Sequence, residues 1–137
     1  MTALPRNPAE WWLAARVVVV LLAIRLALRL AQPLPKLLAA LTPGQARRKA
    51  DWGAADRAAR FIDALQRRRP ATPGGSCLPR SLALYRFARQ AGIPVRFHCG
   101  ARRMHEGVTG HAWLTLDGQP YHEGAAAAGY AEMFSYP

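Results

Sequence analysis

The segment Gly92-Ile93-Pro94 divides the chain into two parts whose apolar residues follow different periods. Before it, apolar residues between Ala54 and Arg69 recur at steps of three and four, the spacing of an amphipathic helix. After it, residues 95–99 alternate between apolar and polar, as a half-buried strand does. Glycine ends helices readily and proline prevents their continuation. The chain is therefore expected to be an α+β protein with its helices first and its strands afterwards.

The second part also carries a hairpin signal. Residues 111–116 and 119–123 flank Asp117-Gly118, a dipeptide that tolerates positive φ at both positions and so favours a tight turn. Residues 102–110 are polar and are expected to form a flexible loop. The strands that remain are expected to pair in an antiparallel sheet.

The amino-terminal part is expected to be a separate segment. Residues 1–50 are expected to form an amphipathic helical segment, and residues 51–137 the main domain. Asn7-Pro8-Ala9-Glu10 is typical of a helix start, and Thr42-Pro43 predicts a further start. The apolar run Val17–Ile24 is less than half of the roughly 20 residues that a membrane span needs. We expect this helix to pack on the domain or on a partner protein, with peripheral membrane contact as the alternative.

Charge and cysteine content narrow the class of protein. The 137 residues include 19 Lys and Arg against 8 Asp and Glu, a formal charge of +11. This excess favours an anionic partner, but no nucleic-acid-binding signature accompanies it, so specific nucleic-acid binding is not expected. Two cysteines and an amino terminus without the order of a secretory signal indicate a reducing cytoplasm, with membrane association possible through the first helix.

Cys77 follows a loop rich in proline and glycine and begins a helical pattern. A thiolate is the nucleophilic form of cysteine, and the amino terminus of a helix stabilises that anion. Backbone N–H groups near the thiol, around Ser76 and Leu78, could contribute to an oxyanion hole. Cys99 instead lies on an alternating strand with Val95 and Phe97 and is expected to be a core residue.

A thiol nucleophile needs a base, and His111 is the best placed of the four histidines. It begins a predicted strand beside Trp113, which could support the site, and it has an acid available across the hairpin. His98 lies opposite its apolar neighbours, His105 falls in the expected loop, and His122 is expected on the other face of the sheet.

Two acids compete for the role of orienting His111. Asp117 is close in sequence, but six residues of extended chain carry it about 20 Å away, to the hairpin tip. Glu123 returns along the second strand to the level of His111 and is the preferred acid. A zinc site is not expected, because no paired spacing of ligands occurs.

The blocks Cys77–Leu84, Ala91–Val95 and Gly110–Leu114, in this order, resemble the stand-alone leader peptidases of lasso-peptide biosynthesis, the B proteins. The resemblance covers residues 54–123. It implies a papain/transglutaminase-like cysteine protease core and a catalytic triad of Cys77, His111 and Glu123. The family usually has Asp at the third position, so Glu123 is a departure.

The same resemblance implies a biological setting. The substrate would be the leader of a ribosomally made precursor peptide, presented by a separate leader-recognition protein, and a macrolactam-forming lasso cyclase would act next. No cofactor is implied. Two rival readings stay open: an acyl transferase on the same Cys–His–acid site, and a non-catalytic protein that binds membrane or nucleic acid through its arginines.

Overall fold

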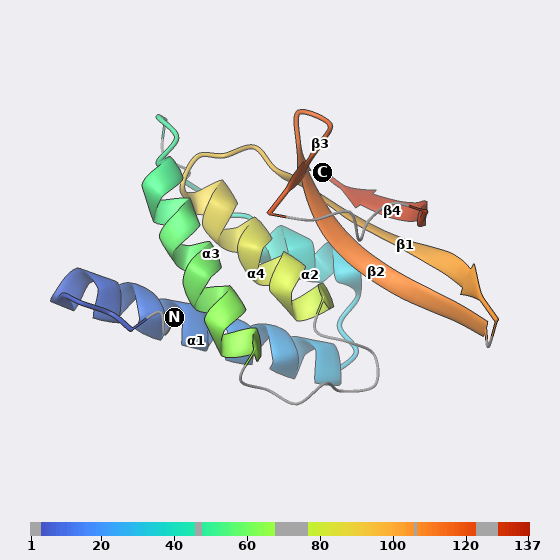
Figure 1. The fold of residues 1–137 in the computed structure, drawn as a ribbon, viewed down its shortest axis with the longest axis horizontal. Coiled ribbons are helices and arrows are strands. Elements are labelled where there is room, and N and C mark those ends of the chain that lie inside the picture. The colour runs from blue at the N-terminus through green and yellow to red at the C-terminus, as the bar shows by residue number, and fades with distance from the viewer. Residues whose placement is uncertain (1–3, 46–47, 68–76, 106, 123–128) are drawn as a thin grey trace.

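The computed structural model describes residues 4–45, 48–67, 77–105, 107–122 and 129–137, and it joins helices to an antiparallel sheet (Figure 1). The elements are α1 (Pro8–Arg29), α2 (Leu34–Leu41), α3 (Trp52–Arg67), α4 (Cys77–Gln90), β1 (Arg96–Met104), β2 (Gly107–Leu116), β3 (Gln119–Tyr121) and β4 (Ala131–Tyr136). Helices precede strands along the chain, so the predicted α+β class is confirmed.

The sheet has the order β3-β2-β1-β4, and every neighbouring pair is antiparallel. The helices gather on one side of it (Figure 1), and α4 packs against both β1 and β2. Phe97 pairs with Leu114 and Cys99 with Ala112, so these four side chains share one face. That face forms the core together with α4, whose Leu82 and Tyr85 are fully buried.

Helix α1 belongs to the same core. Its Val17, Leu21 and Ile24 are buried, and they lie at the three- and four-residue steps that make one helix face. Arg16 and Arg25 bond Gln90 of α4 and Gln66 of α3, respectively. Helix α1 is thus packed against α3 and α4 by apolar burial and by hydrogen bonds.

The opposite side of α1 is exposed and almost as apolar as the buried one. The large exposed residues on this side are Trp11, Trp12, Val18, Val19, Leu22 and Leu26, and the C-cap residue Leu30 is exposed as well. By length and composition alone, the 22-residue helix could cross a membrane, with a mean hydropathy of 2.0 over its most apolar window. Core helices of soluble proteins and amino-terminal signal sequences meet the same criteria, so this finding leaves the location of the protein open.

The ends of the helices follow the predicted signals. The Asn7 side chain accepts a hydrogen bond from the Glu10 amide and caps α1. Gly92 has a φ of 86°, and the bonds from its amide to Arg89 and from the Ile93 amide to Ala88 close α4 with a Schellman motif. The helix predicted from Cys77 to the segment before Gly92 is confirmed.

Two local predictions were wrong. Thr42 does not start a helix within the described residues: it ends α2, with its hydroxyl bonding the Leu38 carbonyl and the Tyr85 hydroxyl. Residues 102–110 are not a loop, because β1 runs to Met104 and β2 begins at Gly107. The arms of this hairpin are exposed on both faces, so no apolar alternation marks them, and backbone pairing holds them together.

Candidate active site

Cys77 is the first residue of α4 and is half-buried. The residue lies at the positive end of the helix dipole, and part of its surface is open to solvent. Leu78, the next residue, is half-buried and packs against the core. Ser76, predicted to support the oxyanion, lies outside the described residues.

The helix that carries Cys77 is tied to β2 beside His111. The Ser81 hydroxyl, fully buried, donates to the carbonyl oxygen of Ala112 at 2.9 Å. Ser81 lies four residues after Cys77 and therefore on the same helix face, about 6 Å along the axis. Ala112 directly follows His111 in β2. This bond brings the backbone segments of the two predicted residues together, whereas the meeting of the sulfur with the imidazole stays a prediction.

The imidazole of His111 lies in an aromatic stack. Its side chain projects from the face of β2 opposite to Ala112, as strand alternation requires. The ring is stacked with Trp113, with centroids 5.9 Å apart, and tilted against Tyr130 at 5.0 Å. Trp113 is 8% exposed and stacks with His98 on its far side. The stack restricts the rotation of the His111 ring, and the supporting role of Trp113 in a catalytic site stays a prediction.

Of the two predicted acids, Asp117 lies within the described residues and Glu123 does not. Asp117 has a φ of 51° and Gly118 a φ of 80°, so the predicted tight turn is confirmed and Asp117 occupies its tip. Glu123 lies outside the described residues, and the described pairs of β3 with β2 end at Leu114 and Tyr121. The choice of Glu123 as the acid therefore stays a prediction.

A second histidine beside the stack has both ring nitrogens engaged. Nδ1 of His98 contacts the Glu132 carboxylate, and Nε2 lies 2.7 Å from the Thr115 hydroxyl. A ring held at both nitrogens is poorly suited to accept a proton from a thiol. The pair therefore favours a structural role for His98. Sequence reasoning did not anticipate Glu132 or Tyr130, because strand β4 was not expected.

The two cysteines have different surroundings. Cys99 is half-buried and packs against the core, as expected. Burial raises the pKa of its thiol, and the nearby Glu132 carboxylate raises that pKa further. A raised pKa lowers the thiolate fraction near neutral pH. The surroundings of Cys99 therefore disfavour a role for it as the nucleophile.

No cluster of three or more His, Cys, Asp or Glu that could hold a metal ion occurs within the part of the chain that the structure describes. Among known proteins, a family model described as the transglutaminase-like superfamily matches residues 18–135, which is most of the chain. Cys77, His111 and Glu123 fall within this range. No curated protein and no solved structure matches.

Proposed function

Because the chain belongs to the transglutaminase-like superfamily, which includes cysteine peptidases and acyl transferases, we propose that it is a cysteine peptidase. Its proposed reaction is removal of the leader from a ribosomally made lasso-peptide precursor before macrolactam formation. The observation that carries the proposal is the bond from Ser81 to Ala112, which sets the start of the Cys77 helix beside the strand of His111. A papain-like catalytic core is part of the proposal.

The chemistry is acyl transfer to water. His111 takes the proton of Cys77, and the thiolate attacks the carbonyl carbon of the scissile amide. The tetrahedral intermediate collapses as His111 gives its proton to the leaving amine, which is the new amino terminus of the core peptide. Water, deprotonated by His111, then hydrolyses the thioester to release the leader carboxylate and the free thiol.

The remaining predicted residues support this cycle. Glu123 accepts a hydrogen bond from the imidazole, fixes its tautomer and stabilises the imidazolium. Backbone N–H groups around Ser76 and Leu78 stabilise the oxyanion, and the stacked ring of Trp113 limits the orientations of His111. The chemistry requires no cofactor.

The proposed partner and location are based on the surface of the protein. We place the docking of a separate leader-recognition protein on the exposed apolar side of α1, since an apolar patch of this length is unusual on a monomer. The excess of arginine favours an acidic leader or partner through faster association. The cytoplasm is the proposed location, and peripheral contact of α1 with a membrane is the alternative use of the same side.

The test is incubation with a candidate precursor peptide, with and without a recognition protein, followed by mass spectrometry. A released leader that ends in a free carboxylate supports hydrolysis. A released leader that is joined to an amine through a new amide bond supports the acyl transferase alternative. Cys77→Ala should abolish the product and Cys99→Ser should retain it. Unchanged processing of the precursor by Cys77→Ala would contradict the proposal. It would favour the alternative of a non-catalytic protein that binds membrane or nucleic acid.

A further inference from the structure

We propose that the edge of β2 at Val108 and Gly110 binds the peptide substrate as an added strand. The ligand is an extended peptide segment, and main-chain groups of β2 bind it, with the scissile bond beside Cys77 and His111. This assignment deepens the proposed function and rests on it, since it concerns the substrate of the same site.

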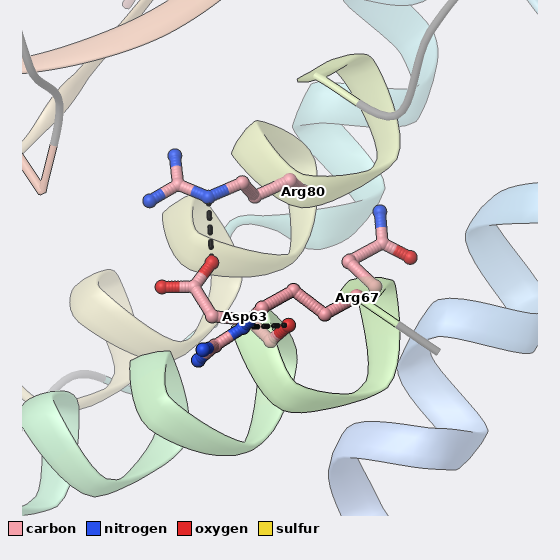
Figure 2. A pocket seen from close by; sticks show the side chains of 4 residues that line it. Asp63, Arg67 and Arg80 are labelled. Carbon is pink, nitrogen blue, oxygen red and sulfur yellow. Dashed lines mark hydrogen bonds and ion pairs between the residues drawn. The ribbon is translucent and has the colours of Figure 1, made fainter. Parts of the chain in front are cut away.

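The side of β2 that faces β3 is only partly covered by the described residues. The pairing with β3 ends at Leu114. At His122 the backbone has a φ of 49°, and the carbonyl oxygen accepts a hydrogen bond at 2.6 Å from Nη2 of Arg80 on α4. Arg80 also bonds Asp63 on α3, as Figure 2 shows. The chain thus turns toward the helices, and among the described strands none pairs with this side of residues 107–113.

Alternate residues of β2 direct their backbone groups to this edge. The turn between β2 and β3 has two residues with positive φ, so Leu116 beside it is hydrogen-bonded to β3. Hydrogen-bonded and non-hydrogen-bonded pairs alternate along an antiparallel ladder, so every second residue from Leu116 points its N–H and C=O to the same side. Ala112 belongs to this series, and its carbonyl accepts from Ser81 of α4, as expected for a group that does not pair with β1. Gly110 and Val108 come next, and both are exposed.

Helix α4 runs along β2 in the same direction (Figure 1). Near the helix end, Nε of Arg89 donates at 3.0 Å to the carbonyl oxygen of Val95, which precedes β1. The start of β1 pairs with Thr115, near the end of β2. Two turns earlier in the helix, Ser81 bonds Ala112. The start of α4 therefore lies toward the first residues of β2.

This progression predicts the level of Cys77, which stands one turn before Ser81. A helical turn advances about 6 Å, the length of about two strand residues, so Cys77 is expected near the level of Gly110. It lies on the helix side of the sheet, whereas His111 projects from the other face. Side chains from two faces can meet around an edge, because no further strand separates them there. A peptide bond held along this edge at Gly110 lies where both groups are expected.

Gly110 is suited to the close approach of another backbone. Its φ is outside the left-handed region, so its conformation does not require glycine. Among the described atoms, a Cβ there would meet only the Gly100 carbonyl oxygen, at 3.7 Å, so packing does not require glycine either. A strand glycine often marks a site where a ligand or a second backbone comes close.

The first test is amide hydrogen exchange by NMR in Cys77→Ala, which should bind peptide without cleaving it. In the free protein, the amides of Val108 and Gly110 should exchange at least about tenfold faster than those of Thr109 and His111, which point to β1. The candidate precursor peptide of the cleavage test should slow exchange at Val108 and Gly110 alone. Protection of these two amides before peptide is added, or no change after it, would overturn the proposal.

The second test compares Val108→Pro with Val108→Ala. Proline removes the N–H at the edge and is tolerated there because that N–H does not pair with β1, whereas alanine keeps it. Val108→Pro should raise the KM for cleavage about fivefold, the value of one hydrogen bond, at a Tm close to that of Val108→Ala. Equal KM values for the two variants would contradict strand addition.

A third test alters the peptide and leaves the protein fold untouched. Single N-methyl groups are placed at successive positions of the precursor, and the Kd for Cys77→Ala is measured by fluorescence anisotropy. Binding should weaken at every second position, because only alternate residues of an added strand point their N–H to β2. This pattern without cleavage by the unmodified protein would end the peptidase proposal and keep the binding edge. Cleavage with no alternation along the peptide would do the reverse.

Discussion

The Ser81 hydroxyl on α4 and the Ala112 carbonyl oxygen on β2 are hydrogen-bonded at 2.9 Å in the core of the protein. One partner stands a single helical turn from Cys77, and the other directly follows His111. The bond therefore joins the helix that begins at the proposed nucleophile to the strand that bears the proposed base. Rigid elements of this kind hold catalytic groups more accurately than loops do.

Ser81→Ala should weaken both the fold and the site. It leaves the buried Ala112 carbonyl without this donor, which costs about 1–3 kcal/mol in the free energy of unfolding. The loss of kcat should exceed what the unfolded fraction explains, because the start of α4 is no longer tied to β2. Urea unfolding and peptide turnover measure the two effects. If Ser81→Ala kept the stability and the turnover of the unmodified protein, the bond would not be what holds α4 against β2.

Gly100→Ala should be strongly destabilising. A Cβ at this position would lie 2.3 Å from the Ala131 carbonyl oxygen and 3.2 Å from the Trp113 ring. Backbone must then move where β4 meets β1, with a cost of several kcal/mol of the kind seen in overpacked cores. Gly110→Ala is the control, since its Cβ would meet nothing closer than 3.7 Å. Equal thermal denaturation midpoints for the two variants would contradict the predicted close approach.

The pH dependence of stability should carry a signature of Tyr121. Burial raises the pKa of its hydroxyl to about 12, and the Asp56 carboxylate adds to that rise. In the unfolded chain the group ionises near pH 10, so stability is unaffected below that pH and falls as the pH rises toward 12. The loss amounts to about 2–3 kcal/mol at most. Tyr121→Phe should show a shallower decline between pH 10 and 12 in denaturant titrations, and parallel curves for the two proteins would refute the prediction.

Substitutions that remove only charge should separate the two candidate acids. Glu123→Gln should lower kcat because the imidazolium loses its partner, whereas Asp117→Asn should leave it unchanged. Asn keeps the turn, since it tolerates the positive φ that Asp117 adopts. Steady-state kinetics on one peptide substrate measures both. A larger loss from Asp117→Asn, with folding intact, would reverse the assignment.

Local signals predicted the fold well where a side chain fixes the backbone. Asn7 capped a helix, Gly92 ended one, and Asp117-Gly118 formed the turn that their chemistry requires. The helix start predicted at Thr42 was wrong. The Thr42 hydroxyl is hydrogen-bonded to the Leu38 carbonyl and to the Tyr85 hydroxyl, and the local sequence does not reveal these contacts. A capping residue can end a helix as well as begin one, and tertiary packing decides which.

The parts of the sheet and of the candidate site that depend on long-range pairing could not be predicted from the sequence. β4 was not predicted, since it is stabilised by pairing with β1 and its residues are mostly exposed or half-buried. The contacts of Tyr130, Glu132 and Arg80 depend on segments far apart in sequence. Positions 77 and 111 were predicted from their place at a helix start and a strand, which local patterns do reveal, whereas the groups that hold them were not.

The most direct test of the site is the rate of Cys77 alkylation as a function of pH, in a Cys99→Ser background with and without His111→Ala. A thiolate paired with an imidazolium reacts rapidly well below the ordinary pKa of a cysteine. We expect the protein that retains His111 to be alkylated much faster than His111→Ala at acidic and neutral pH. Profiles that coincide would mean that sulfur and imidazole do not interact, and the proposed catalytic pair would be contradicted.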